Sequence, residues 1–130
     1  MNALRILVID DSPTQLAAIR KVLTGLGHAV ATTSKQEEAQ RRLGEAPFDL
    51  VIVDYHMPDH DGGEVLEYLR ASKIAGAPRF YLYTTDATVA SLDQSLGFDG
   101  AFLGKGDVEL LKAQVGSVAA EIADAGVKSK

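Results

Sequence analysis

The sequence predicts an α/β fold, a doubly wound parallel sheet of five strands with helices on both faces. Short, almost continuous apolar runs alternate five times with segments whose apolar residues recur at helical spacing. Continuous apolar runs are typical of strands that are covered on both faces, and right-handed crossovers place the intervening helices there. The 130 residues are the length of one domain. We therefore expect a single domain with a single site.

The first two strands and the helix between them occupy the start of the chain. Residues 4–9 are an apolar run, and residues 29–33 form a second, weaker strand. Between them, Ser12 is a favoured N-cap residue and Pro13 a favoured first helical residue, so the first helix is expected to begin there. Apolar residues then recur at helical spacing as far as a pair of glycines, which end the helix.

The second helix and the third strand follow. The segment Ser34–Glu37 has the form of a capping box, which predicts a helix over residues 34–43. Pro47 interrupts any continuation of that helix. Residues 50–53 are apolar throughout and predict the third strand over residues 49–53, after which residues 54–63 form a polar loop.

The next elements repeat the alternation with weaker signals. A helix is predicted over residues 63–72, and a fourth strand over residues 79–83. Residues 87–96 predict a short helix, because Val89, Leu92 and Leu96 fall on one side at helical spacing.

The chain closes with a short strand and a longer helix. The strand is predicted over residues 100–103, and apolar steps of three and four residues predict a helix over residues 108–122, capped by Asp107. The residues from 126 onward are polar. We therefore expect a domain over residues 1–125 and a polar C-terminal tail over residues 126–130.

The composition excludes several classes of function. There is no cysteine, so disulfides, thiolate metal sites and thiol nucleophiles are excluded. The net charge of −5 disfavours a surface that follows nucleic-acid phosphates. No apolar stretch approaches a membrane span, and no signal peptide precedes the first strand. We expect a cytoplasmic protein with no nucleic-acid partner and no membrane insertion.

Polar side chains follow four of the five predicted strands. Ligands of open parallel sheets bind beyond the carboxyl ends of the strands, where these residues converge. The residues are Asp10 and Asp11 after the first strand, Asp54 after the third, Thr84 and Thr85 after the fourth, and Lys105 after the fifth. Three neighbouring carboxylates repel one another unless a cation lies between them. Mg²⁺ prefers oxygen ligands and relieves this repulsion, so the sequence predicts a magnesium site.

The same set of residues suits phosphoryl transfer. A carboxylate beside Mg²⁺ can act as a nucleophile toward phosphorus and form an aspartyl-phosphate. An ammonium then pairs with the phosphoryl oxygens, and a hydroxyl donates to another of them. The histidines are expected to add no second metal site: His28 is expected to be structural or merely exposed, and His56 and His60 lie in the polar loop after Asp54 rather than on a helix.

Four short segments carry a resemblance to a known family. They are Ile9-Asp10-Asp11-Ser12, Val53-Asp54-Tyr55-His56-Met57-Pro58 with Gly62 closing the loop, Tyr83-Thr84, and Phe102 with Lys105. With these segments the chain resembles, over essentially its whole length, the receiver domain of two-component response regulators. It is most similar to the stand-alone, chemotaxis-type receivers. The resemblance implies a flavodoxin-like (βα)5 fold with strand order 2-1-3-4-5.

The resemblance implies a phosphoacceptor and its metal ligands. Asp54 is the implied phosphoacceptor. Asp11 would bind Mg²⁺ directly, and Asp10 chiefly through water. Asp54 and the backbone carbonyl of His56, rather than its imidazole, complete the implied metal ligands. Mn²⁺ is the alternative metal.

Further positions receive roles in the same way. The resemblance implies that Thr84 is the switch hydroxyl and that Lys105 contacts the phosphoryl group. Phe102 matches the aromatic switch residue, although its pattern also fits a plain core residue of the fifth strand. The positions that modulate the site are His56, Thr85 and Asp86.

Two residues depart from the family pattern. Thr85 follows the switch threonine, where the family usually has alanine or glycine, and it either crowds the phosphoryl group or adds a hydroxyl. Gly106 follows the lysine, where the family usually has proline, so we expect a more flexible final loop.

The function that these residues predict is a phosphorylation-controlled signalling switch. A partner histidine kinase or phosphotransfer protein would supply the phosphoryl group, and the surface around residues 86–118 would change its affinity for a downstream protein. The chain would not be an enzyme beyond phosphorylating itself and slowly losing the phosphoryl group at Asp54.

Other functions stay open at this point. One is a phosphorelay intermediate or phosphate sink. Another is a pseudo-receiver that binds a protein constitutively. A metal-dependent phosphatase of the haloacid type is disfavoured, because its nucleophile belongs to a D-x-D arrangement that Asp10-Asp11 does not match. No Lys or Arg lies between residues 80 and 104, which disfavours a charge-paired dimer, so we expect a monomer.

Overall fold

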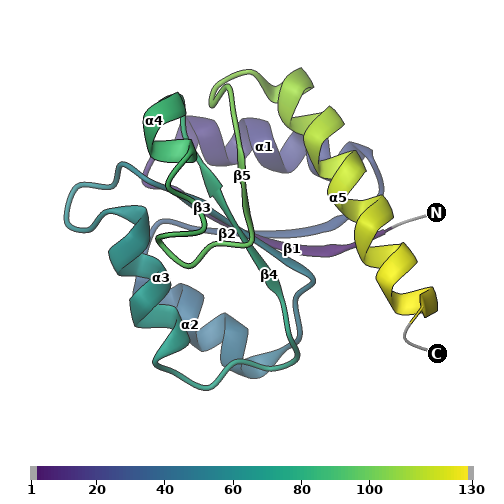
Figure 1. The fold of residues 1–130 in the computed structure, drawn as a ribbon, viewed down its shortest axis with the longest axis horizontal. Helices are drawn as coiled ribbons and strands as arrows, with labels where there is room; N and C mark the ends of the chain where they lie inside the picture. Colours follow the sequence, from purple (N-terminus) through teal and green to yellow (C-terminus); the bar gives the residue numbers. More distant parts are fainter. Residues whose placement is uncertain (1–2, 129–130) are drawn as a thin grey trace.

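The chain folds into one parallel sheet between two layers of helices. The structure is a computed structural model that describes residues 3–128, with the side chains of residues 3–125. The strands are β1 (Arg5–Ile9), β2 (Ala29–Thr33), β3 (Leu50–Asp54), β4 (Arg79–Tyr83) and β5 (Gly100–Phe102). The helices are α1 (Pro13–Gly25), α2 (Gln36–Glu45), α3 (Gly62–Arg70), α4 (Ala87–Ala90) and α5 (Val108–Lys128). All strand pairs are parallel, in the order β2-β1-β3-β4-β5, which confirms the predicted fold class and strand order (Figure 1).

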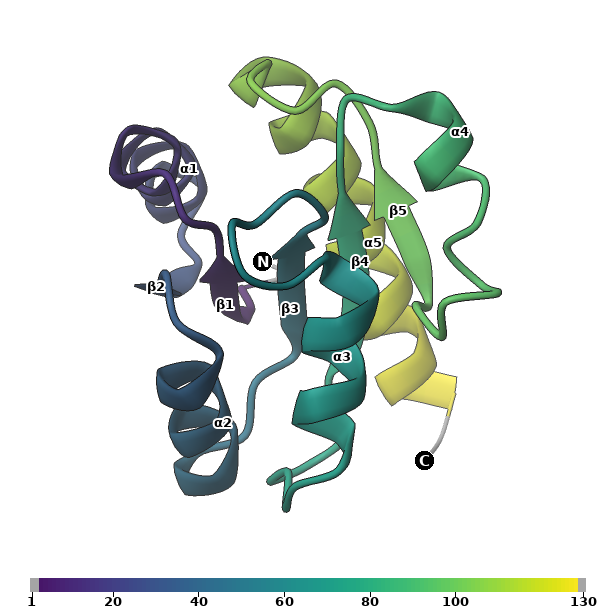
Figure 2. The same cartoon turned by 90° about the vertical axis from the view of Figure 1, so that its left-hand side faces the viewer.

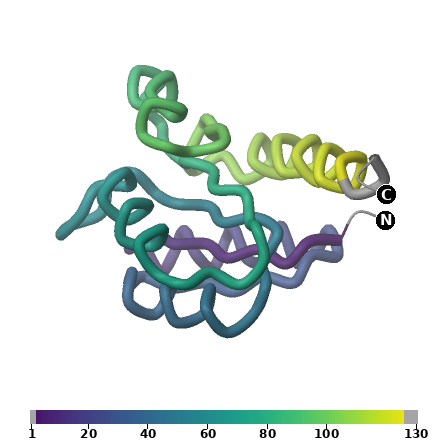
Figure 3. Tube along the Cα trace, turned by 60° about the horizontal axis from the view of Figure 1, so that its bottom comes forward, coloured from purple at the N-terminus to yellow at the C-terminus, as the bar shows by residue number. Residues whose placement is uncertain are grey.

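Two apolar clusters fix the helices to the sheet. Ile19 of α1 and Leu111 of α5 join sheet residues in one buried cluster, so these two helices cover the same face. Leu43 of α2 and Leu66 of α3 belong to a second cluster on the other face. Figure 2 shows α2 and α3 side by side along that face, and Figure 3 shows α5 ending on the side where β1 begins. Within residues 3–128, no helix has the length and apolar character needed to cross a membrane.

The central strands are buried on both sides, as their continuous apolar composition predicts. Every residue of β3 is buried, and so are residues 6–9 of β1. Because β3 is wholly buried, its last residue, Asp54, is buried as well, although it carries a carboxyl group. The sheet therefore carries an acidic side chain at the edge of the apolar core.

Side chains cap the first and last helices as predicted. The Ser12 hydroxyl accepts the Gln15 N–H at 3.3 Å at the start of α1. Asp107 Oδ1 accepts the Leu110 N–H at 3.1 Å at the start of α5. These bonds satisfy backbone donors that have no partner within the helix.

The capping box predicted at Ser34–Glu37 is wrong. α2 begins after Lys35, which makes no side-chain cap bond, and the Lys35 N–H donates instead to Thr33 Oγ1 at 3.1 Å. A capping box lies at the start of α3: Asp61 Oδ1 accepts the Glu64 N–H at 2.9 Å, and Glu64 Oε1 accepts the Asp61 N–H at 3.1 Å. The Asp-x-x-Glu spacing was the signal that would have found it.

The helix predicted over residues 87–96 is wrong in its length. α4 is four residues long, and residues 91–97 form successive turns. The Ser91 hydroxyl donates to a carbonyl of α4, and the Asp93 carboxylate accepts the N–H of the next residue. Such local bonds compete with the helical backbone. As a result Leu92, predicted to share one side of a longer helix with Val89 and Leu96, is 46% exposed.

The last helix is longer than predicted. α5 continues to Lys128, past residue 122 and into the polar tail predicted over residues 126–130. Residues 129 and 130 of that tail lie outside the described residues.

Gly62 allows the loop after β3 to close. A Cβ at this position would lie 3.0 Å from Tyr55 Cα and 3.1 Å from the Asp54 carbonyl oxygen. The Gly62 N–H donates to the Tyr55 carbonyl at 2.8 Å. α3 can therefore begin against the end of β3 only because no side chain stands between them.

His28 has the structural role that was expected. Its side chain is 7% exposed, and Nδ1 accepts the Leu4 N–H at 3.0 Å, which joins the start of β2 to the start of β1. Burial lowers the pKa of the imidazole, because burial disfavours its charged form. The fold therefore holds this histidine neutral.

We predict that Gly62→Ala destabilises the protein by about 1–3 kcal/mol, because the new methyl group meets the backbone of β3. Gly116 in α5 is the matched control, since nothing lies within 4 Å of a Cβ there. Gly116→Ala should stabilise the protein by about 0.5–1 kcal/mol. Urea unfolding measures both, and an unchanged stability of Gly62→Ala would contradict the close approach.

We predict that His28 makes stability depend on pH. The folded pKa lies below the unfolded value, so its stabilising contribution is complete above about pH 6.5 and is lost as the pH falls from there through the folded pKa. His28→Asn keeps an acceptor for Leu4 but does not titrate. Urea unfolding at pH 8, 6.5 and 5 gives the free energy of unfolding of both proteins. The natural sequence should lose its excess stability over His28→Asn as the pH falls, and a difference that stays constant with pH would contradict the prediction.

Candidate functional site

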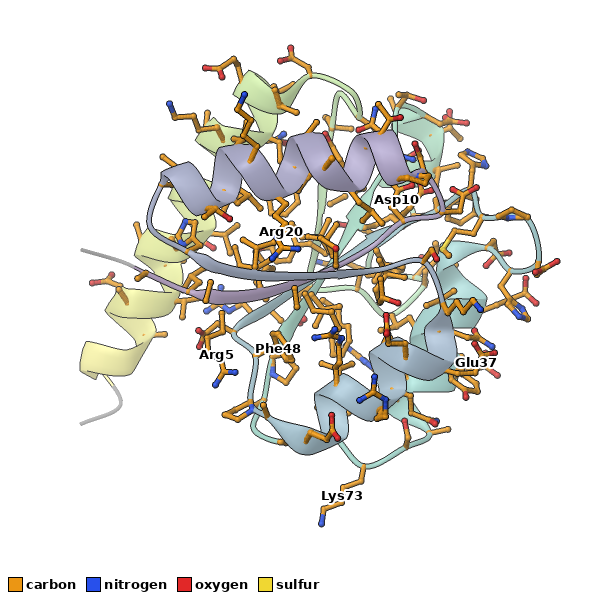
Figure 4. The ribbon with its side chains drawn as sticks, turned by 180° about the vertical axis from the view of Figure 1, so that it is seen from behind. Arg5, Asp10, Arg20, Glu37, Phe48 and Lys73 are labelled. Atoms are coloured by element: carbon orange, nitrogen blue, oxygen red, sulfur yellow. The ribbon has the colours of Figure 1, made fainter. Side chains whose placement is uncertain are left out.

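The predicted polar residues gather at the carboxyl edge of the sheet. Asp10 directly follows β1, and Asp54 is the last residue of β3. Tyr83 at the end of β4 is the register partner of Asp54, so Thr84 is the next residue on the neighbouring strand. Figure 4 shows Asp10 and Arg5 at opposite ends of β1. Parallel strands therefore deliver these side chains to one edge, as predicted.

Three carboxylates form a compact acidic cluster there. One oxygen from each of Asp10, Asp11 and Asp54 lies within 4.8 Å of the others. Asp10 and Asp54 are each 1% exposed, whereas Asp11 is exposed to solvent. The cluster is thus open on the side of Asp11, where a hollow of about 390 Å³ lies between the start of α2 and the loop after β3.

Lys105 reaches the two buried carboxylates from the loop after β5. Its ammonium lies 2.8 Å from Asp54 Oδ1 and 3.2 Å from Asp10 Oδ2. Backbone N–H groups add two further donors: Ser12 donates to Asp10 Oδ1 at 2.9 Å, and His56 donates to Asp54 Oδ1 at 3.3 Å. One cation and two dipoles thus compensate two buried negative charges.

That compensation is incomplete for Asp54. Burial first, and then the charge of Asp10, raise its pKa to about 6, despite the lowering effect of Lys105 and the His56 N–H. For Lys105, burial acts to lower the pKa, but the hydrogen bond to Asp54 and the charges of both carboxylates outweigh it, and the pKa is raised. Lys105 therefore stays charged near neutral pH.

The carboxylates fit a divalent cation. Asp54 Oδ2 is buried without a hydrogen-bond partner, whereas Asp10 Oδ2 is paired with the Lys105 ammonium at 3.2 Å. Buried acceptors without donors are costly, and a cation would satisfy them. Carboxylate oxygens are the ligands of hard metal ions, so the donor set suits such an ion at this edge.

Thr84 is buried beside the acidic cluster. Its hydroxyl oxygen accepts the Asp86 N–H at 3.0 Å, and its own N–H donates to the Phe102 carbonyl at 3.4 Å. Asp86 is exposed, and its Oδ1 accepts the Thr88 and Val89 N–H groups at 2.9 and 3.3 Å, which caps α4. Hydrogen bonds therefore link the Thr84 hydroxyl to Asp86, and Asp86 to the start of α4.

The remaining predicted residues lie in different surroundings. Phe102 is 2% exposed and stacks on Tyr81, with ring centroids 4.6 Å apart, so its ring lies in the core. His56 and Thr85 are exposed. The His56 imidazole packs edge-on against the ring of Tyr55 at 5.0 Å rather than pointing to the carboxylates.

The loop around Lys105 is bonded to a residue at the end of β4, Tyr83, whose role no sequence pattern indicates. Gly106 has φ +102°, a conformation that proline cannot adopt, and its N–H donates to the Tyr83 hydroxyl at 3.3 Å. Tyr83 was named as part of the fourth strand and of the segment Tyr83-Thr84, with no role of its own. No local pattern marks its hydroxyl, because the partner is 23 residues away along the chain.

Comparison with known proteins places this geometry in a family. Residues 6–103 match the response regulator receiver domain. The two-component response regulator ARR11 of Arabidopsis thaliana is 43% identical over 68 residues, which are 51% of this chain and 13% of that protein. The sensory/regulatory protein RpfC of Xanthomonas campestris is 32% identical over 76 residues, which are 58% of this chain and 10% of that protein. The chain thus spans about a tenth of the length of these curated relatives.

Solved structures agree in fold. The chemotaxis response regulator CheY4 of Vibrio cholerae superposes with a TM-score of 0.77 at 23% identity, covering 89% of this chain and 98% of that one. The response regulator TrrA of Thermotoga maritima gives a TM-score of 0.72 at 29% identity, covering 87% and 96%. Since the family match includes most of the chain, this protein belongs to the response regulator receiver domains, the signalling switches of two-component systems that work with histidine kinases or phosphotransfer proteins.

Proposed function

We propose that the chain is a phosphoacceptor switch that receives a phosphoryl group on Asp54 from a partner histidine kinase or phosphotransfer protein. The observation that carries the proposal is the position of Asp54: a buried carboxylate at the end of β3, held 2.8 Å from the Lys105 ammonium. The unsatisfied oxygen of this carboxylate could bind a cation, and the paired ammonium could bind the anionic phosphoryl group.

The proposed chemistry is nucleophilic displacement at phosphorus. An Asp54 carboxylate oxygen attacks the phosphorus of the donor phosphohistidine, the P–N bond breaks, and the imidazole leaves as the acyl phosphate P–O bond forms. Lys105 pairs with the phosphoryl oxygens as their charge moves toward Asp54. The chain thereby modifies itself and is not an enzyme in the ordinary sense.

Asp10, Asp11, Asp54 and the His56 carbonyl would hold the metal ion that this chemistry needs, with Mg²⁺ as the proposed ion and Mn²⁺ as the alternative. When bound, it would offset the repulsion between the carboxylates and the incoming phosphoryl group. The compact acidic cluster and the buried Asp54 Oδ2, which has no hydrogen-bond partner, support this assignment. The related TrrA structure is described as a complex with Mg²⁺ and beryllofluoride.

We further propose that Thr84 and Phe102 pass the change at Asp54 to the surface formed by α4, β5 and α5. The Thr84 hydroxyl would donate to a phosphoryl oxygen and give up its present bond from the Asp86 N–H. Phe102 follows because its carbonyl accepts the Thr84 N–H. A downstream protein would recognise the altered surface, and exposed Leu103 and Leu110 offer apolar contacts for it.

The exposed residues around the site would set the lifetime of the phosphoryl group. His56, Thr85 and Asp86 are all exposed, and each follows Asp54 or Thr84 by one or two residues in the chain. They could therefore contact an attacking water or a partner. We propose a monomer that works in the cytoplasm, because residues 80–104 hold no Lys or Arg for a charge-paired dimer and the chain has no cysteine.

A phosphorelay intermediate is the second candidate, because one related protein is described as a probable histidine kinase, 27% identical over 75 residues. Transfer of phosphate back from Asp54 to a phosphotransfer protein would favour the relay. A pseudo-receiver that binds its partner constitutively would show neither transfer.

The central experiment is to add Mg²⁺ with acetyl phosphate, or with beryllofluoride, and to follow amide chemical shifts. We expect shifts at Asp54, Thr84 and Phe102 and their absence in Asp54→Asn, because the amide is not a nucleophile toward phosphorus. An intact fold that binds neither reagent would rule out the phosphoswitch and favour the pseudo-receiver.

We predict that Asp54→Asn is more stable than the natural sequence in EDTA by about 1–3 kcal/mol at pH 7, because an ionised carboxylate leaves a buried site. The folded pKa is raised, so the penalty is present above about pH 6 and vanishes as Asp54 protonates toward pH 4. Urea unfolding at both pH values checks this. Asp11→Asn, at an exposed position, should change stability much less; an equal gain in both variants would contradict a burial effect.

A further inference from the structure

Lys105 lies between two glycines, whose backbone conformations are not restricted by side chains. It stands between Gly104, with φ +70°, and Gly106, with φ +102°. Glycine has more conformational freedom than any other residue, so ordering a Gly-Lys-Gly segment costs more backbone entropy than ordering a segment without glycine. The ammonium is nevertheless placed 2.8 and 3.2 Å from two carboxylates. The Asp107 N–H donates to the Gly104 carbonyl at 2.8 Å and closes the turn around Lys105, and contacts with other elements fix this turn to the rest of the fold.

The loop is anchored on both sides of Lys105. Before it, the Leu103 N–H donates to Gln114 Oε1 at 3.0 Å, and Gln114 Nε2 donates to the Leu103 carbonyl at 3.1 Å. After it, the Gly106 N–H donates to the Tyr83 hydroxyl at 3.3 Å. The first anchor belongs to α5, at the surface. The second belongs to β4, one residue before Thr84, and so to the sheet that carries the site.

The Tyr83 hydroxyl is an unusual group to find at this depth. The side chain is 1% exposed, packs in the cluster with Phe102, and has its pKa raised by burial. Phenylalanine would fill the same space without a polar atom to satisfy. A buried hydroxyl costs free energy unless it is hydrogen-bonded, and here its acceptor capacity is used on the backbone beside Lys105.

We propose that Tyr83 is a positioning residue for phosphoryl binding: its hydroxyl anchors Gly106 to β4 and thereby holds the Lys105 ammonium where the phosphoryl oxygens arrive. This inference rests on the proposed phosphoacceptor function of Asp54. Tyr83 touches no reacting atom and acts through Lys105 alone. The anchor bears on the metal ligands Asp10 and Asp54 only through the Lys105 ammonium that pairs with both, and that positive charge opposes a cation at the same oxygens.

The test compares Tyr83→Phe with the natural sequence, using Mg²⁺ alone and then beryllofluoride in saturating Mg²⁺ as probes. Titrations followed by amide shifts give both dissociation constants. We expect Tyr83→Phe to weaken beryllofluoride binding about two- to tenfold, the range of one lost hydrogen bond. Mg²⁺ binding should not weaken, because a less firmly held ammonium competes less for the same carboxylates. Exchange of the Gly106 amide hydrogen with solvent should accelerate in the same variant, because its acceptor is gone.

Two controls separate positioning from a general loss of stability. Tyr68→Phe removes another hydroxyl, on α3, which donates to Gln40 Oε1 over a distance of 3.3 Å. This substitution should change neither dissociation constant. In a Lys105→Ala background, Tyr83→Phe should have no further effect on beryllofluoride binding, because the two residues act in one path.

The outcomes are distinct. Natural beryllofluoride affinity in Tyr83→Phe, an equal weakening of both probes, or an undiminished effect of Tyr83→Phe in the Lys105→Ala background would each overturn the inference while the phosphoswitch stands. Failure of the natural sequence itself to bind beryllofluoride with Mg²⁺ would overturn the proposed function, and this inference with it.

Discussion

The ion pair between Lys105 and Asp54 is the interaction on which the rest of the site depends. Asp54 ends the most buried strand of the sheet, where a lone carboxylate would be strongly disfavoured. An ammonium 2.8 Å away makes that burial tolerable, but only in part, since the pKa of Asp54 still rises to about 6. Because the compensation is partial, the site keeps an affinity for additional positive charge, and the same lysine remains available to an incoming anion.

Much of the surrounding packing serves to deliver these two groups to the same point. Parallel pairing brings the end of β3 beside the end of β4, and Gly62 lets the next helix start against the strand without displacing it. Two covered faces keep the sheet rigid, and Tyr83 and Gln114 tie down the glycine-flanked lysine. Fold and chemistry are thus linked through a few contacts at one edge rather than through the core as a whole.

Sequence patterns predict the positions of the strands and of the polar residues at their ends, because both follow from local composition. The continuous apolar run of β3 predicts burial, and the residue after such a run must lie at the sheet edge. Patterns fail where the outcome depends on competing local bonds or on distant partners. Ser91 and Asp93 end α4 early through their own hydrogen bonds, Thr33 displaces the expected cap of α2, and the bond of Tyr83 joins residues that only the fold brings together.

The hydrogen bonds from Thr84 through Asp86 into α4 have a thermodynamic consequence. A helix of four residues has too few internal bonds to persist on its own, so its cap supplies a large share of its local stability. Any new partner that draws the Thr84 hydroxyl away takes an acceptor from the residue that forms this cap. The signal would then be carried as a change in the fraction of molecules in which this segment is folded, with no rigid element having to move.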